Sequence, residues 1–322
     1  MKSKERIILN LNEKVAVLLP CYNEELTIGK VIEDFKKELP NADIYVYDNN
    51  SKDRTFEVAQ EKGAIVRKEM RQGKGNVVRS MFADIEADYY LMVDGDDTYP
   101  AEYCHEILEA LRNKEANMVI GDRLSNGTYT EENKRNFHDF GNSLVRNTIN
   151  RIFKSNLRDI MTGYRGFDRY FVKTMPVLSP GFEIETEMSI HALENRFSVK
   201  EIEIDYRDRP EGSESKLNTF SDGFKVIMTI IKLFKNSRPF LFFNLLASLF
   251  VIIGVIIGLP VIIQFAQIGL VLKFPSALLA TGIILMGMLF FICGLILDTI
   301  AHRNRQIYFL ELVKYRERNP ID

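Results

Sequence analysis

The chain is poor in the residues that build zinc, soft-metal and redox sites. Its 322 residues include only three cysteines and four histidines. Their spacing matches no zinc or redox motif, so we expect reduced cysteines and structural or solvated histidines. A Ser-His-Asp hydrolase ordering is also missing. The residues concerned are Cys21, Cys104, Cys293, His105, His138, His191 and His302.

Glycine-rich nucleotide-binding motifs are missing as well. The segment Gly73-Lys74-Gly75 lacks the third glycine of a dinucleotide fingerprint, and there is no phosphate-binding P-loop. Hydride transfer therefore gains no support. Two interpretations of the tripeptide remain: a helix start that offers backbone N–H groups and the Lys74 ammonium to a diphosphate, or a plain exposed helix start.

Charged side chains are absent from two long stretches, residues 240–267 (28 residues) and 274–297 (24 residues). Each is longer than the roughly 20 residues with which a helix crosses the hydrocarbon core. We expect two membrane spans, with a kink at Pro260 in the first. A buried hairpin in a soluble core is the alternative.

Basic residues flank these spans, whereas the connection between them carries only Lys273. The positive-inside rule therefore predicts that the N-terminal region and the C-terminal tail both lie in the cytoplasm. The charged start, residues 1–14, does not resemble a signal peptide. The net charge of −2 gives no reason to expect nucleic-acid binding. The flanking basic residues are Lys225, Lys232, Lys235, Arg238, His302, Arg303, Arg305, Lys314, Arg316 and Arg318.

Residues 15 to about 210 alternate between short apolar runs and helical patterns. This α/β alternation predicts a mainly parallel sheet covered by helices, which binds ligands beyond the carboxyl ends of its strands. Polar residues gather at three such ends, at 20–24, 48–51 and 94–98. The expected strands are 15–19, 43–48, 64–68, 89–93 and 118–121, and the expected helices are 25–38, 53–61, 75–85 and 101–112, with Gly63 ending the second.

The turn after the apolar run 89–93 carries three acids, Asp94, Asp96 and Asp97, without a neighbouring base. Carboxylates this close repel one another, and Mg²⁺ or Mn²⁺ relieves the repulsion while leaving positions for substrate phosphates. A solvated acidic turn is the alternative. The pattern predicts a divalent-metal site.

Five motifs, in order, resemble those of the inverting nucleotide-sugar glycosyltransferases of family 2. Within that family, the chain is similar to dolichyl-phosphate mannose synthase and to the bacterial polyprenyl-phosphate glycosyltransferases of the GtrB type. The resemblance covers residues 15 to about 220. The motifs are Leu19–Glu25, Asp48–Asp53, Asp94 with Asp96, Gly121–Arg123 with Leu157–Arg165, and Gly212–Lys216.

This resemblance implies a Rossmann-like GT-A catalytic domain followed by a two-helix transmembrane hairpin. The implied parts are a cytoplasmic catalytic domain at 1–215, an amphipathic juxtamembrane helix at 216–238, two transmembrane helices at 239–298 and a cytoplasmic tail at 299–322. The chain would then be a multi-pass protein of the cytoplasmic membrane.

The resemblance also implies a role for each matching residue. Those that would hold the donor base and ribose are Pro20, Tyr22, Glu24 and Asp48, with Lys74 near the donor. Asp94 and Asp96 would mark the diphosphate and the metal, with Asp96 as a direct ligand. Those that would surround phosphates are Arg123, Arg135 and Lys216, and Asp159 would face the reaction centre. The departures from the family pattern are Asn49 and Asn50, in place of an acid and a glycine, and Thr98, where mannose synthases often have glutamine.

The implied reaction is inverting transfer of a hexose from a nucleotide sugar to a polyprenyl (undecaprenyl) phosphate. A UDP-hexose is the favoured donor and GDP-mannose the alternative. The lipid-linked sugar would serve cell-envelope glycan modification and pass to a flippase, and the enzyme would form a homo-oligomer. A lipid phosphate is already largely ionised at neutral pH, so Asp159 would orient it rather than deprotonate it. The nearby acids Glu183, Glu185 and Glu187 fit an exposed or cap-proximal helix start better than a competing catalytic set.

The segment 220–234 places aromatic and aliphatic residues at helical spacing, with Lys225 and Lys232 interleaved. This pattern is typical of an interfacial helix on anionic lipid. A helix packed against the catalytic domain would show the same pattern.

Two other functional classes remain to be weighed. A processive polysaccharide synthase closes its acceptor site with a Gln-x-x-Arg-Trp element and a larger membrane channel, whereas this chain has no tryptophan and two spans. A non-enzymatic membrane scaffold or transport component would not need the acids at the strand ends.

Overall fold

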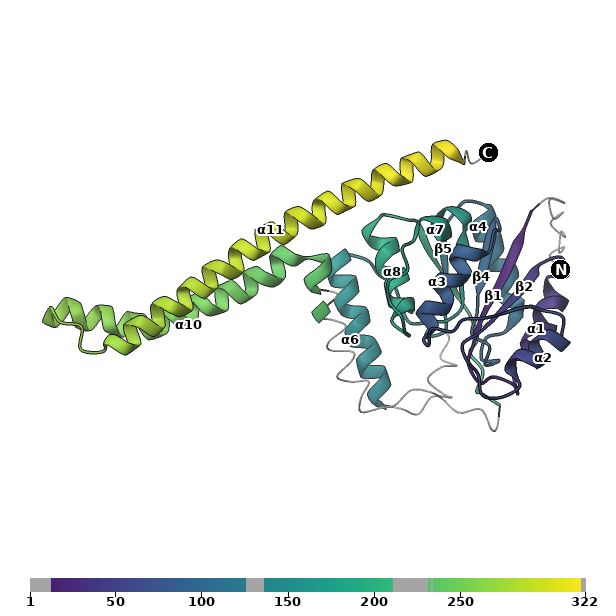
Figure 1. The fold of residues 1–322 in the computed structure, drawn as a ribbon, viewed down its shortest axis with the longest axis horizontal. Helices are drawn as coiled ribbons and strands as arrows, with labels where there is room; N and C mark the ends of the chain where they lie inside the picture. Colours follow the sequence, from purple (N-terminus) through teal and green to yellow (C-terminus); the bar gives the residue numbers. More distant parts are fainter. Residues whose placement is uncertain (1–12, 126–135, 211–230, 233, 320–322) are drawn as a thin grey trace. The chain divides into compact units, whose positions relative to one another are not determined.

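The structure is a computed structural model that describes residues 13–125, 136–210, 231, 232 and 234–319. The chain divides into two compact units, Met1–Gly223 and Phe224–Asp322. The first unit contains a sheet and the helices that cover it, and the second contains two long helices (Figure 1).

The first unit holds a seven-stranded sheet in the order β3-β2-β1-β4-β6-β5-β7. The pairs β1–β2, β2–β3, β1–β4 and β5–β7 are parallel, whereas β6 runs antiparallel to both β4 and β5. The strands are β1 (Val15–Cys21), β2 (Asp43–Asp48), β3 (Ile65–Lys68), β4 (Tyr89–Met92), β5 (Met118–Asp122), β6 (Arg165–Asp168) and β7 (Val199–Glu203).

The expected GT-A-like α/β architecture is confirmed, and all five expected strands are present. The sequence pattern missed β6 and β7, and with them the antiparallel pairing. Among the described residues of this unit, the helices are α1 (Ile28–Glu38), α2 (Thr55–Glu61), α3 (Lys74–Asp84), η1 (Ala101–Tyr103), α4 (Cys104–Arg112), α6 (Asn136–Phe153), α7 (Arg169–Thr174) and α8 (Ile184–Glu194). Gly63 follows α2 with φ of 71°, as expected of a helix terminator.

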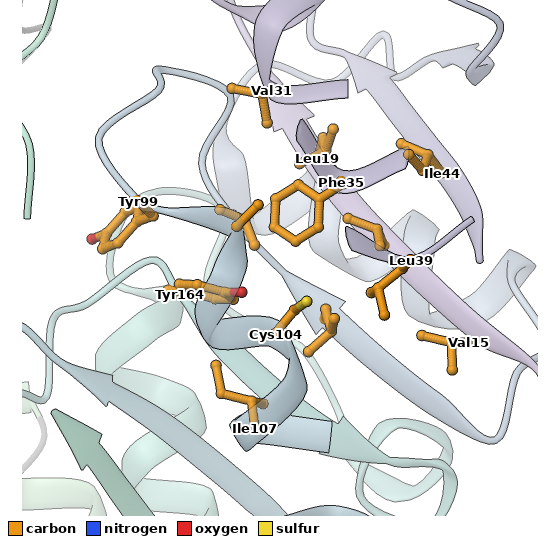
Figure 2. Close-up of a cluster of buried hydrophobic side chains, with 14 of the residues drawn as sticks. Val15, Leu19, Val31, Phe35, Leu39, Ile44, Tyr99, Cys104, Ile107 and Tyr164 are labelled. Atoms are coloured by element: carbon orange, nitrogen blue, oxygen red, sulfur yellow. The ribbon is translucent and has the colours of Figure 1, made fainter. Parts of the chain in front are cut away.

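Successive side chains of each strand point to opposite faces of the sheet, so the core has two layers. One layer joins odd-numbered β1 side chains, such as Leu19, to the apolar faces of α1 and α4. Figure 2 shows Phe35 of α1 inside this cluster, where its ring meets Tyr164 edge-on at 6.3 Å. On the other side of the sheet, Phe167 of β6 contacts Phe82 of α3 and stacks on Phe171 of α7.

The antiparallel strand β6 determines where the site can form. Arg165, its first residue, pairs with Met92 near the end of β4 and with Ile120 near the end of β5. Since β4 and β5 run the other way, the segment that leads into β6 arrives at the same edge where those strands finish. Residues 157–164 are therefore brought to the loops that follow β1, β2, β4 and β5.

The second unit contains α10 (Pro239–Ile268) and α11 (Phe274–Arg318), both long and apolar enough to cross a membrane by length and composition. Small residues let the two helices approach closely: a Cβ on Gly254 would lie 2.5 Å from Ile284, and one on Gly287 would lie 3.0 Å from the Ala247 carbonyl. Helix α11 continues through the residues expected to form a tail and ends at Arg318.

Candidate active site

The loops after β1 and β2 bind each other through side chains. The Ser51 hydroxyl accepts the Asn23 N–H at 2.8 Å, and Thr55 Oγ1 accepts the Glu24 N–H at 2.8 Å. Asp48, at the end of β2, is buried and accepts the Ser51 N–H at 3.2 Å. Pro20 lies in β1, opposite Tyr47 of β2. The structure thus places the residues expected to bind the donor base and ribose beside one another.

Asn49, one of the departures from the family pattern, binds the loop between β3 and α3 at three points. Its amide donates to the carbonyls of Glu69 at 3.0 Å and Arg71 at 2.8 Å, and its oxygen accepts the Gly73 N–H at 2.6 Å. A carboxylate could not make the two donations. The asparagine therefore fixes the β3–α3 loop to the end of β2.

Lys74, the first residue of α3, forms ion pairs with Asp94 at the end of β4 and with Glu185 in the first turn of α8. The Lys74 and Glu185 side chains are only 9% and 7% exposed, and that of Asp94 is 28% exposed. Burial alone would lower the pKa of Lys74, but the two carboxylates outweigh it and raise that pKa. Lys74 is therefore a fixed ammonium ion beside the acidic turn.

The three acids lie at the start of α8, as expected of a cap-proximal set, but Glu185 is not exposed. It is buried, and burial raises its pKa while Lys74 opposes the shift. Glu187 accepts the N–H groups of Leu178 and Ser179 at 2.9 and 2.8 Å, so it holds the preceding loop. Glu183 alone is exposed.

The start of α3 is not the plain exposed helix start, and it does not offer the backbone N–H groups that the diphosphate interpretation required. The N–H of Gly75 donates to the Gly181 carbonyl at 3.1 Å, and that of Asn76 to the Pro180 carbonyl at 3.2 Å. A Cβ on Gly75 would lie 1.9 Å from the Ser179 carbonyl oxygen. These N–H groups therefore serve packing between loops, and only the Lys74 side chain faces the acids.

Asp96 lies in the acidic turn and is 4% exposed. One carboxylate oxygen accepts the Thr98 hydroxyl at 2.7 Å, and the other pairs with the Arg209 guanidinium. Burial raises the pKa of Asp96, the charge of Asp94 raises it further, and Arg209 opposes both. Asp97 instead pairs with Lys30 on α1 at 2.7 Å. Two of the three acids of the turn therefore share one electrostatic site.

Within the described ranges, no group of three or more histidine, cysteine, aspartate and glutamate residues is arranged to hold a metal ion. Asp94 and Asp96 repel each other, so they fit a cation that takes its remaining ligands from a substrate or from water; such a cation would share these carboxylates with Lys74 and Arg209.

Asp159, expected to face the reaction centre, and Arg123, expected to lie near phosphates, bind each other. The Arg123 Nε donates to Asp159 at 2.8 Å, and its other nitrogens reach the Tyr99 hydroxyl at 3.2 Å and the Met161 carbonyl at 3.1 Å. Asp159 is 2% exposed. Tyr99 also accepts the Gly163 N–H at 3.0 Å, which connects this pair to the loop before β6.

The sequence patterns missed Arg209 and Tyr99 as partners of the expected residues. Arg209 belongs to the segment after β7, where the Arg207 N–H donates to the Thr98 carbonyl at 2.9 Å and the Tyr206 ring contacts Tyr99 at 5.5 Å. Position in the sequence gave no signal for either contact. The expected phosphate ligands Arg135 and Lys216, and most of the expected juxtamembrane helix 216–238, lie outside the described residues.

Comparison with known proteins agrees with this arrangement. The sequence model of glycosyl transferase family 2 matches residues 16–175. Glycosyltransferase AglJ of Haloferax volcanii is 34% identical over 72% of this chain and 76% of its own length. A dolichyl-phosphate hexose transferase of the same organism is 27% identical over 70% of this chain and 96% of its own length.

Solved structures give the same fold. Glucosyl-3-phosphoglycerate synthase of Mycobacterium tuberculosis, crystallised with Mn²⁺, UDP and phosphoglyceric acid, matches with a TM-score of 0.57 at 18% identity, over 70% of this chain and 79% of that one. At this identity the likeness concerns the fold alone. The family match and the AglJ similarity show that the chain belongs to glycosyl transferase family 2, and the solved structures show the GT-A fold. The protein is therefore a glycosyltransferase.

Proposed function

We propose that the protein transfers a hexose from a nucleotide sugar, a UDP-hexose in preference to GDP-mannose, to a polyprenyl phosphate such as undecaprenyl phosphate, with inversion. One observation carries this proposal: a single edge of the sheet holds both an acidic site with its own lysine and a separate Arg123–Asp159 pair. Two apolar helices in the same chain, and relatives named for dolichyl phosphate, support a lipid acceptor.

The donor half consists of Asp48 and the cluster around Asp94, Asp96 and Lys74. Asp94 and Asp96 would hold Mg²⁺ or Mn²⁺, which stabilises negative charge on the departing diphosphate. The related synthase crystallised with Mn²⁺ and UDP supports this choice of cofactor. Lys74 adds a fixed positive charge beside these acids, and Glu185 keeps it there.

The acceptor half consists of Arg123 and Asp159. The acceptor phosphate needs little deprotonation, since a phosphomonoester loses its second proton near pH 6. Its approach to an anionic donor is the harder step, and preorganised positive charge at the reaction centre lowers that barrier. Asp159 is buried and bound to Arg123 through both oxygens, so it orients the guanidinium rather than removing a proton. Arg135 and Lys216 would supply further positive charge.

The proposed location is the cytoplasmic membrane, with the catalytic unit and the C-terminus in the cytoplasm. The support is the charge distribution along the sequence: basic residues precede α10 and follow the apolar part of α11, whereas Lys273 alone lies between the helices. A reporter fused after Asp322 should be found in the cytoplasm. A reporter that is accessible only from outside the cell would contradict this orientation.

The test is a screen of nucleotide sugars with the purified full-length protein, undecaprenyl phosphate and Mg²⁺ or Mn²⁺. We expect one UDP-hexose to give a sugar-labelled lipid that partitions into organic solvent, and Asp96→Asn to give none. If only GDP-mannose gives labelled product, the donor is GDP-mannose and not a UDP-hexose. Sugar transfer only to a soluble acceptor, or polymer formation, would refute the lipid acceptor.

A further inference from the structure

The segment that carries Asp159 has no regular secondary structure between α6 and β6. Its backbone polar groups are bound instead by side chains from neighbouring elements. Asn150 of α6 binds both backbone groups of Leu157, accepting its N–H at 3.0 Å and donating to its carbonyl at 2.8 Å. The position of Asp159 therefore depends on a small number of specific side-chain contacts.

Glu201 binds the backbone of Asp159 itself. One oxygen of its carboxylate accepts the N–H of Arg158 at 2.7 Å and the N–H of Asp159 at 3.1 Å. Glu201 lies in β7 opposite Ile120 of β5 and is partly buried. Burial raises the pKa of Glu201, and the two backbone N–H groups oppose that shift.

Arg165 binds the other side of the same segment. This fully buried side chain donates to the carbonyls of Ile160 at 2.5 Å and Thr162 at 3.1 Å, and to the Ser189 hydroxyl at 2.9 Å. An anion therefore holds the N–H groups on one side of Asp159, and a cation holds the carbonyls on the other. Hydrogen bonds to charged groups are stronger than neutral ones, so the segment has a defined conformation despite its irregular backbone.

We propose that Glu201 is a positioning residue for the transfer reaction, because its carboxylate fixes the backbone at Asp159 and through it the Arg123 guanidinium. The proposal rests on the acceptor role given above to these two residues. Glu201 need not contact either substrate. A displacement of about 1 Å in a reacting group can lower a rate by about 100-fold, so loss of this anchor should appear in kcat.

The chain offers a matched control two residues along the same strand. Glu203 pairs with the Arg158 side chain at 3.2 Å, but both side chains are more than half exposed and the backbone is not involved. Exposed pairs of this kind contribute little. Glu203→Ala therefore removes a charge from the same strand and a contact to the same neighbour without releasing the Asp159 backbone.

The experiment compares Glu201→Ala, Glu201→Asp, Glu201→Gln and Glu203→Ala in the full-length protein. Glu201→Ala should lower kcat by about 10- to 100-fold, while UDP affinity in the presence of Mn²⁺ changes by less than about twofold. Glu201→Asp keeps the negative charge, but its shorter side chain moves the carboxylate away from the two N–H groups. It should lower kcat without lowering the melting temperature. Glu201→Gln should recover most of the rate, because its amide oxygen can accept both N–H groups. Glu203→Ala should behave as wild type.

Hydrogen exchange provides a readout that does not depend on activity. The amides of Arg158 and Asp159 should exchange faster in Glu201→Ala than in wild type, with no change in β1 or β4. Unchanged kcat and unchanged exchange in Glu201→Ala would overturn the positioning role, as would equal losses in Glu201→Gln and Glu201→Ala. If the wild type transfers no sugar to a lipid phosphate, the proposed function fails, and the exchange comparison still decides whether Glu201 holds this backbone.

Discussion

Replacement of Lys74 by methionine tests the buried charge cluster at the centre of the donor half. Methionine is close to the lysine side chain in length and apolar, so the change removes the charge with little change in volume. Asp94 and Glu185 would lose their shared counter-charge, and at 7% exposure Glu185 has almost no access to water. Breaking a buried ion pair from one side costs about 3–5 kcal/mol.

That loss should be visible in thermal unfolding of the full-length protein in detergent. For a domain of this size about 1 kcal/mol corresponds to about 2–4 °C, so the melting temperature should fall by about 6–20 °C. Burial already raises the pKa of Glu185, and removal of Lys74 removes the group that opposes this shift. The folded variant then holds the Glu185 proton more tightly than the unfolded chain, so part of the lost stability should return as the pH is lowered.

A second substitution separates stability from catalysis. Lys74→Met combined with Glu185→Gln removes one uncompensated carboxylate, so the double variant should melt above the single variant. Its turnover should remain low, because the fixed charge beside the donor site is still missing. A Lys74→Met protein that melts within about 2 °C of wild type would refute the claim that this ion pair is buried and coupled.

Two further predictions concern other parts of the catalytic unit. Gly163→Ala would place a Cβ 2.2 Å from an Asp94 carboxylate oxygen, so it should displace that carboxylate and reduce turnover and Mn²⁺ affinity; unchanged Mn²⁺ affinity by calorimetry would contradict this. Burial lowers the pKa of His191, which packs against Phe171 and Phe197, to about 4. As the pH falls, His191 of the unfolded chain is protonated before His191 of the folded chain, so the free energy of unfolding should fall by about 3 kcal/mol between about pH 6.5 and 4. If a His191→Phe variant shows the same pH dependence of melting, His191 is not the cause.

In four of the five strands that the sequence predicted correctly, local pattern and environment agree; the exception is β3, an edge strand whose side chains are mostly exposed. β1, β2, β4 and β5 are apolar runs buried on both faces, and each ends in polar residues. β6 has only four residues, Arg-Gly-Phe-Asp, with a glycine inside and a charge at each end, so its composition gives no strand signal. Its place in the sheet comes from pairing with β4 and β5, which is a property of the whole fold.

The same reasoning explains which parts of the site were foreseen. The acids at strand ends were predictable because parallel strands bring their carboxyl ends to one edge. The partners were not, since Glu185 is 111 residues from Lys74 and Arg209 is 113 residues from Asp96. In the sequence alone, Glu185 has the features of a common first-turn acid. Only the tertiary structure shows that it is buried and bound to a lysine.

The division of the site into donor and acceptor halves is tested most directly by Asp159→Asn. UDP-sugar affinity and single-turnover transfer to polyprenyl phosphate would be measured on the same protein preparation. We expect transfer to slow by about two orders of magnitude or more while donor affinity stays close to wild type, because Asp48, Lys74 and Asp96 lie on other segments of the chain. Loss of donor affinity in proportion to the loss of rate would place Asp159 in the donor pocket and contradict the account, as would full activity.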